Sequence, residues 1–137
     1  MHPVCPPSIL IAEDMPEILE YFGKLFKKSG YDVVLAASGR EAFEAFKVRH
    51  FDVILSDVLM DNGDGIELLK NAKALRPNTL VILLTGDISD HAQEAQQYGA
   101  HDVLLKPIYG SKLLDRIRCA LSEHANAQPS VDDEISI

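Results

Sequence analysis

The sequence predicts one α/β domain in which helices cover both faces of a parallel five-stranded sheet. Short apolar runs alternate with segments of helical periodicity five times along 137 residues, a length typical of a single domain. Each run is continuously apolar instead of alternating with polar residues, as in parallel strands that are buried on both faces. Repeated strand–helix units join through right-handed crossovers and form a three-layer sandwich.

The five expected strands are rich in Ile, Leu and Val. They cover residues 9–12, 31–36, 53–55, 80–84 and 103–105. The first intervening helix is expected to start at Pro16 and to end before Gly30. The second starts at Ser38, with Glu41 in a capping-box pattern, and the third ends before Pro77. The apolar positions expected on the buried sides of these three helices are Ile18, Phe22, Leu25, Phe26, Ala42, Phe43, Phe46, Leu68, Ala72 and Leu75.

The last two expected helices differ in apolar content. The fourth, residues 88–97, offers only Ile88 and alanines, so we expect it to be loosely held. The fifth has apolar residues at helical spacing, which are Leu113, Ile117, Ala120 and Leu121. Periodicity stops near Ala125. We therefore expect an N-terminal extension over residues 1–7, one domain over 8–124, and an acidic tail over 125–137 with no second domain behind it.

Composition excludes several classes of function. Thirteen Lys and Arg against 21 Asp and Glu leave a net charge of −8, which argues against direct nucleic-acid binding. No apolar run approaches the roughly 18 residues needed to span a bilayer, and the N-terminus does not read as a signal peptide. Two cysteines cannot form a disulfide framework. Free thiols in the cytoplasm, away from membranes, are the simplest interpretation.

Ionisable and hydroxyl side chains follow four of the five expected strands. They are Glu13, Asp14, Asp57, Thr85 and Lys106. Ligands of open parallel sheets bind at the carboxyl ends of the strands, so we expect these groups to converge. Two carboxylates about 4 Å apart repel by about 4 kcal/mol at an effective dielectric of 20, so the cluster needs a cation. Mg²⁺ suits carboxylate and phosphate oxygens, and the set favours a phosphoryl-binding site.

The order and spacing of these residues resemble the receiver domain of two-component response regulators, over about residues 8–123. The motifs that carry the resemblance are Glu13-Asp14, Asp57-Val58-Leu59-Met60 followed by Asp64-Gly65, Thr85-Gly86, and Lys106-Pro107. The resemblance implies a flavodoxin-like (βα)5 fold with strand order 2-1-3-4-5. It also implies a cis bond before Pro107 that turns Lys106 toward the site.

The resemblance assigns a role to each matching residue. Asp57 would accept the phosphoryl group, and Mg²⁺, with Mn²⁺ as a substitute, would be held near it. Asp14 would bind the metal directly, Glu13 through water, and Leu59 through its backbone carbonyl. The residues that would contact the phosphoryl group or move with it are Thr85, Gly86 and Lys106, and those expected to modulate the site are Asp87 and Val103.

Three departures from the family pattern affect these expectations. Asp61 stands where the family often has proline, which predicts a more acidic and more flexible loop. Val103 stands where a large aromatic residue is common, so no aromatic side chain can swing there. The fourth helix is poor in apolar residues. We therefore expect output through movement of the loop after Thr85 and of the fourth helix.

These expectations describe a phosphoacceptor switch and not an enzyme, although it would catalyse its own phosphorylation and dephosphorylation. Its partners would be a sensor histidine kinase or a histidine phosphotransfer protein, and an unknown downstream protein. That protein would bind the surface of the fourth helix, fifth strand and fifth helix. The chain is expected to be a monomer or weak dimer. The alternative is a receiver module from a longer response regulator or hybrid histidine kinase.

Two other classes of protein fit the residues less well. A phosphohydrolase of the haloacid-dehalogenase family would carry a second aspartate two residues after its nucleophile, where this chain has Leu59. A flavodoxin-like nucleotide or flavin binder would need a loop rich in Gly, Ser or Thr after the first strand. Here Glu13 and Asp14 would repel a phosphate group.

Overall fold

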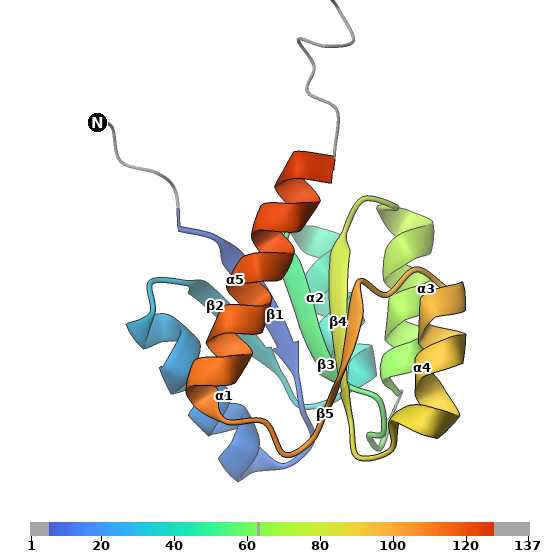
Figure 1. The fold of residues 1–137 in the computed structure, drawn as a ribbon, viewed down its shortest axis with the longest axis horizontal. Coiled ribbons are helices and arrows are strands. Elements are labelled where there is room, and N and C mark those ends of the chain that lie inside the picture. The colour runs from blue at the N-terminus through green and yellow to red at the C-terminus, as the bar shows by residue number, and fades with distance from the viewer. Residues whose placement is uncertain (1–5, 63, 128–137) are drawn as a thin grey trace, which may run out of the picture.

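A computed structural model describes residues 6–62 and 64–127 of the chain. The five strands and five helices alternate, as the sequence predicts (Figure 1). The strands are β1 (Ser8–Ala12), β2 (Asp32–Ala36), β3 (Val53–Asp57), β4 (Leu80–Thr85) and β5 (Asp102–Leu105). The helices are α1 (Pro16–Lys28), α2 (Gly39–Val48), α3 (Gly65–Leu75), α4 (Ile88–Gln97) and α5 (Gly110–Ala127).

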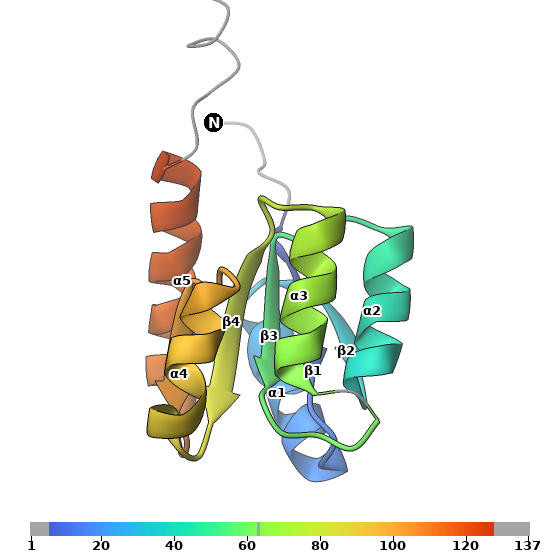
Figure 2. The same cartoon turned by 90° about the vertical axis from the view of Figure 1, so that its right-hand side faces the viewer.

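The sheet is parallel throughout, and its order β2-β1-β3-β4-β5 confirms the expected topology. Helices α1 and α5 cover one face, and α2, α3 and α4 cover the other (Figure 2). The sheet separates two apolar clusters, because side chains of successive strand residues point to opposite faces. In β1, Ile9 and Ile11 join the cluster under α1 and α5, whereas Leu10 and Ala12 join the cluster under the other three helices.

The signals at the helix ends act as the sequence predicts. Helix α1 begins at Pro16, and Gly30 follows its end with a positive φ of 93°. The Ser38 side chain accepts a hydrogen bond from the Glu41 N–H at the start of α2, at 3.1 Å. Helix α4 begins and ends where the sequence predicts. No helix among the described residues is both long and apolar enough to cross a bilayer.

Three expectations about burial and length need correction. Strands β2 and β5 lie at the sheet edges, where helices cover them incompletely, so Leu35 is 37% exposed and Leu105 is 51% exposed. Leu75 is 48% exposed because it ends α3, whereas Leu69 is fully buried. Helix α5 runs to Ala127, past the expected start of the tail. Residues 1–5 and 128–137 of the expected terminal segments lie outside the described residues.

Candidate functional site

Three carboxylates meet at the carboxyl edge of the sheet. Asp57 is the last residue of β3, and Glu13 and Asp14 follow β1 directly. One oxygen of each lies within 4.8 Å of the others. Glu13 is 1% exposed and Asp57 is 3% exposed, so water screens their mutual repulsion only weakly. The predicted convergence of these side chains is confirmed, and the cluster has the oxygen ligands that a hard divalent cation prefers.

Lys106 supplies the positive charge that faces these carboxylates. It follows β5, and the peptide bond between it and Pro107 is cis, as the resemblance implies. Its Nζ lies 3.0 Å from Asp57 Oδ1 and 4.0 Å from Glu13 Oε1. Among the carboxylates of the cluster, Asp57 therefore makes the close, charge-assisted hydrogen bond. One ammonium beside three carboxylates leaves the site with excess negative charge.

Glu13 shows the effects of its burial and of that excess negative charge. Its Oε2 accepts a hydrogen bond from the Met15 N–H at 3.0 Å, but its buried Oε1 has no hydrogen-bond partner within the described part of the chain. Burial, and then the adjacent Asp57 carboxylate, raise the pKa of Glu13 to about 8. A buried oxygen without a donor, in a carboxylate cluster, fits a site for Mg²⁺.

Thr85 ends β4 at the same edge and is 3% exposed. Its Oγ1 accepts a hydrogen bond from the Asp87 N–H at 3.2 Å and lies 3.3 Å from the Asp87 carbonyl oxygen, to which it can donate. In β4, Leu84 is the register partner of Asp57, so Thr85 stands one residue beyond it. Gly86 and Asp87 are exposed. The hydroxyl thus holds the loop before α4 in a tight turn.

The segment after Asp57 packs closely against it. A Cβ on Gly65 would lie 2.1 Å from the Asp57 carbonyl oxygen, so only glycine allows α3 to begin there. The Gly65 N–H donates to the Val58 carbonyl at 2.8 Å, and the buried Ser56 hydroxyl donates to the Asp57 carbonyl at 2.8 Å. In the sequence, Gly65 stands out only as part of the Asp64-Gly65 motif, and no sequence pattern marks Ser56. The Leu59 side chain is 68% exposed.

The loop at Asp61 is tied to its surroundings, although the sequence predicts a flexible loop. The Asp61 N–H donates to Asp14 Oδ2 at 3.2 Å. The Asn62 carbonyl accepts a hydrogen bond from the Arg40 N–H at 3.2 Å, at the start of α2. Sequence patterns do not reveal these contacts, because they join backbone groups to segments far away along the chain.

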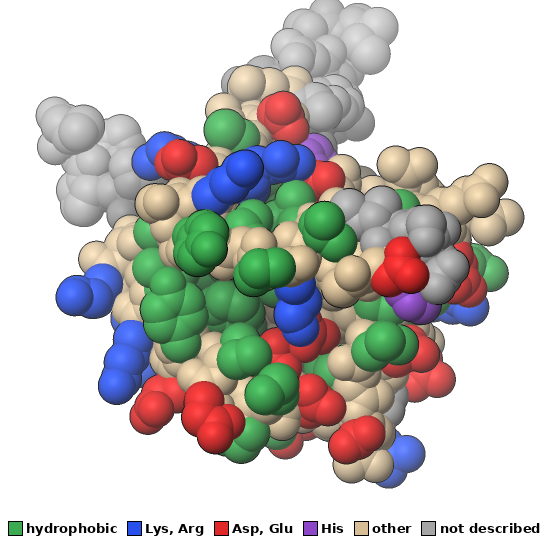
Figure 3. Space-filling view, turned by 60° about the horizontal axis from the view of Figure 1, so that its bottom comes forward, with side chains coloured by type: hydrophobic (Ala, Val, Ile, Leu, Met, Phe, Trp, Pro, Cys, Tyr) green, Lys and Arg blue, Asp and Glu red, His purple; other side chains and the backbone are tan. Residues whose placement is uncertain are grey.

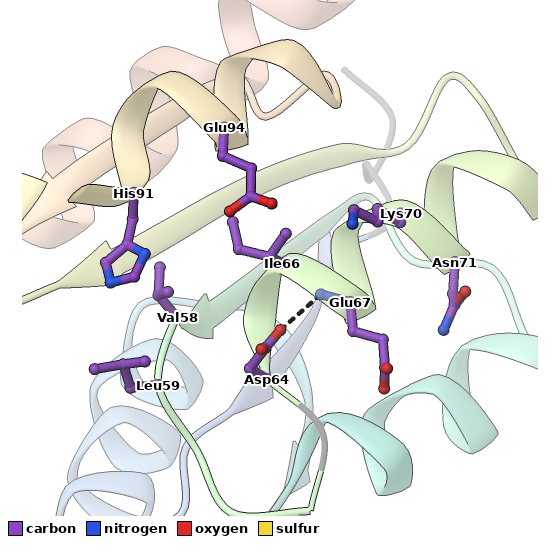
Figure 4. A pocket seen from close by; sticks show the side chains of 9 residues that line it. All are labelled: Val58, Leu59, Asp64, Ile66, Glu67, Lys70, Asn71, His91 and Glu94. Carbon is purple, nitrogen blue, oxygen red and sulfur yellow. Dashed lines mark hydrogen bonds between the residues drawn. The ribbon is translucent and has the colours of Figure 1, made fainter. Parts of the chain in front are cut away.

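Helix α4 is separated from α3 by an open pocket of about 450 Å³ beside the site (Figure 4). Val58 and Ile66 form its apolar floor, and the α4 residues His91 and Glu94 line the opposite wall. Ala95 is the fully buried α4 residue among those whose side chains the structure describes. The half-buried Val103 packs against the same cluster as Ala95. The expected weak anchoring of α4 therefore agrees with its packing.

The surface around the site combines acidic and apolar side chains. Figure 3 views the carboxyl edge of the sheet, where acidic side chains cluster and hydrophobic ones gather beside them. Exposed hydrophobic residues from the segments at this edge are Met15 (51%), Leu59 (68%), Leu105 (51%) and Tyr109 (78%). Such a surface is typical of a site that a protein partner covers.

The fold and the site define a receiver domain, a signalling module with an acidic Mg²⁺ pocket. Residues 9–118 match the family model of the response regulator receiver domain, and the chain belongs to this family. Receiver domains act as switches in two-component systems and interact with histidine kinases or phosphotransfer proteins.

The relatives include both single domains and parts of longer proteins. The chain is 35% identical over 124 residues to the transcriptional regulatory protein GlrR of Escherichia coli, covering 89% of this chain but only 28% of GlrR. A CheY-like receiver domain from Methanospirillum hungatei matches with a TM-score of 0.86 and 29% identity, covering 90% of this chain and 99% of that one. The receiver domain of a histidine kinase from Syntrophus aciditrophicus matches with a TM-score of 0.78 and 31% identity, covering 91% and 96%.

Proposed function

We propose that Asp57 accepts a phosphoryl group from a phosphohistidine on a sensor histidine kinase or a histidine phosphotransfer protein. The observation that carries this proposal is the 3.0 Å contact between Asp57 Oδ1 and Lys106 Nζ inside the carboxylate cluster. A carboxylate oxygen of Asp57 would form the new P–O bond while the P–N bond of the donor breaks and its electron pair returns to the imidazole.

The other residues would position and neutralise the transferred group. Glu13, Asp14, Asp57 and the Leu59 carbonyl would hold Mg²⁺, or Mn²⁺ in its place. The metal would neutralise charge on the phosphoryl oxygens, and Lys106 would pair with those oxygens after transfer. Phosphoryl transfer needs positioning and electrostatic stabilisation more than covalent assistance. Because the chain itself supplies these groups, we expect self-catalysed phosphorylation from a small donor such as acetyl phosphate.

The experiment that tests this proposal is Phos-tag electrophoresis after incubation with acetyl phosphate and Mg²⁺. Wild type is expected to give one shifted band, and Asp57→Asn none. Asp32→Asn is a matched control, because Asp32 is an exposed aspartate that pairs with Arg49 away from the site. EDTA should abolish the shift. A shifted band in Asp57→Asn would show that another residue is the acceptor.

The response to phosphorylation is proposed to begin at Thr85. Its hydroxyl would leave Asp87 and donate to the phosphoryl group, which would draw the loop before α4 toward Asp57. The pocket between α3 and α4 offers space for α4 to move. Gly86 would allow the loop to change, and Asp87 and Val103 would modulate the change. The surface of α4, β5 and α5 would then bind an unknown downstream partner.

Hydrogen exchange with and without beryllofluoride, a phosphoryl mimic, tests this switch. One charge-assisted hydrogen bond contributes roughly 1.5–3 kcal/mol, enough to shift populations by about ten- to a hundredfold. Protection is expected to change in residues 86–97 and β5, and the change should be lost in Thr85→Ala. Thr79→Ala is the control, because Thr79 is buried before β4, at the opposite edge of the sheet. Equal responses in wild type and Thr85→Ala would contradict the proposed switch.

The chain could belong to a longer response regulator or hybrid kinase, because it spans about a quarter of the length of the curated relatives GlrR and ZraR. We propose that the domain itself is a monomer or weak dimer in the cytoplasm and binds no nucleic acid directly. Its net charge of −8 supports the last point. A pull-down in both phosphorylation states would identify the partner.

A further inference from the structure

The hydrogen bond between the Asp61 N–H and Asp14 Oδ2 joins the phosphoacceptor loop to an expected metal ligand. The donor is the backbone N–H of residue 61, which a proline at this position would lack. We propose that Asp61 is a positioning residue whose backbone N–H orients the Asp14 carboxylate for the divalent cation. This inference rests on the proposed function of the cluster as a metal site.

The contact has the features of an orienting interaction. It is the hydrogen bond that the Asp14 side chain makes within the residues that the structure describes, so it determines how this half-buried carboxylate is turned. It occupies Oδ2 at 3.2 Å and leaves a second oxygen for a cation. Met15, which follows Asp14, donates its N–H to Glu13 Oε2, so both acidic residues after β1 are held by backbone donors.

The loop is supported so that the Asp61 N–H faces Asp14. On one side, the Asn62 carbonyl accepts from the Arg40 N–H at 3.2 Å. On the other side, the Gly65 N–H closes the loop onto Val58 at 2.8 Å. Asn62 has a φ of 55°, a left-handed conformation that asparagine tolerates better than most residues. These contacts hold the donor in place before any cation binds.

Removing a group that orients a metal ligand typically costs about 10–100-fold in metal affinity. Asp61→Pro removes the N–H and the side-chain carboxylate, whereas Asp61→Asn removes only the negative charge and keeps the N–H. The two variants therefore separate orientation from charge. We expect Asp61→Pro to weaken Mg²⁺ binding by about tenfold or more, and Asp61→Asn to weaken it by much less.

The experiment is a Mg²⁺ titration of the three proteins without a phosphodonor, read by calorimetry and by the rise in Tm. Equal affinities for Asp61→Pro and Asp61→Asn would overturn the inference and leave the metal site intact. Failure of wild type to bind Mg²⁺ would overturn both the inference and the proposed metal site.

An NMR measurement keeps the inference testable if Asp61→Pro does not fold. In Asp14→Ala the Asp61 amide loses its acceptor, so its proton resonance should move upfield from its wild-type position. Lys70→Ala, on the distant side of α3, is the control and should leave that resonance in place. An unchanged Asp61 amide in Asp14→Ala would show that the hydrogen bond does not form in solution.

Discussion

Helices α3 and α4 follow neighbouring strands of the sheet, yet they are anchored to different degrees. Helix α3 buries an apolar face made of Ile66, Leu68, Leu69 and Ala72. Among the α4 side chains that the structure describes, Ala95 alone is buried, and polar residues face the pocket toward α3. The free energy that holds a helix to a sheet comes mainly from its buried apolar face, so α4 is the easier of the two to displace.

The first turn of α3 is also held more firmly than the first turn of α4. Helix α3 begins at Gly65, in contact with the Asp57 backbone, and the Asp64 side chain caps it by accepting from the Glu67 N–H at 2.8 Å. Helix α4 follows exposed residues that are held by the Thr85 hydroxyl. The proposed phosphoacceptor Asp57 therefore lies beside the firmly held α3, and the Thr85 hydroxyl, which is proposed to respond to phosphorylation, lies beside the weakly held α4.

The largest expected effect is on the free energy of unfolding when the buried apolar face of α3 is disrupted. Leu69→Ala empties a fully buried position under α3 and should lower the free energy of unfolding by about 2–5 kcal/mol. Ala95→Gly removes the one buried side chain among those that the structure describes on α4, and it should cost only about 1 kcal/mol, mostly in helix propensity. Urea denaturation measures both values. Equal losses would contradict the difference in anchoring.

The second prediction concerns the loops that begin the two helices. Gly65→Ala would force a methyl group against the Asp57 carbonyl and should lower the free energy of unfolding by about 1–3 kcal/mol. Gly86→Ala has open space around its Cβ and should change it by no more than about 0.5 kcal/mol. Thermal and urea unfolding of the two variants provide the comparison. A neutral Gly65→Ala would show that α3 can move away from Asp57.

The third prediction concerns how pH and Mg²⁺ change the stability of the protein through Glu13. Without metal, the pKa of Glu13 is raised from 4.5 to about 8, so the native state binds more protons than the unfolded state between these values. Its contribution to stability is therefore present at low pH and is lost as pH rises through this window, at up to about 1.4 kcal/mol per pH unit. Mg²⁺ should replace the proton on Glu13, and it should therefore stabilise the protein most near pH 8, at the upper end of this pH window.

Thermal unfolding across the window, with and without Mg²⁺, tests this dependence. Glu13→Gln keeps the shape of the side chain but does not titrate, so its metal-free stability should fall less steeply with pH than that of wild type. Parallel pH profiles for the two proteins would contradict a raised Glu13 pKa.

The smallest expected difference is in the hydrogen exchange of α3 and α4, and it can be measured in the wild-type protein. Amides of α4 are expected to exchange with solvent faster than those of α3, because fewer apolar contacts hold α4. Native-state hydrogen exchange followed by NMR gives the opening free energy of each helix. Comparable protection in both helices would mean that α4 is held by something other than apolar burial.

Much of the fold follows from local patterns in the sequence. Continuous apolar runs identify the five strands, and even the weak pattern of α4 predicts its correct ends. The exposure of Leu35 and Leu75 could not be predicted, because burial at a sheet edge or a helix end depends on how far the neighbouring elements extend. The sequence also does not predict the hydrogen bond that the Ser56 hydroxyl donates to the Asp57 carbonyl.

The sequence by itself determined which chemical groups follow each strand, and parallel topology requires those groups to share one edge. Only the tertiary structure decided how they interact there. The pairing of Lys106 with Asp57, the raised pKa of Glu13 and the hydrogen bond from Asp61 to Asp14 all depend on distances between segments that are far apart along the chain. Electrostatic and hydrogen-bond energies change steeply with distance and burial, and a residue's identity specifies neither.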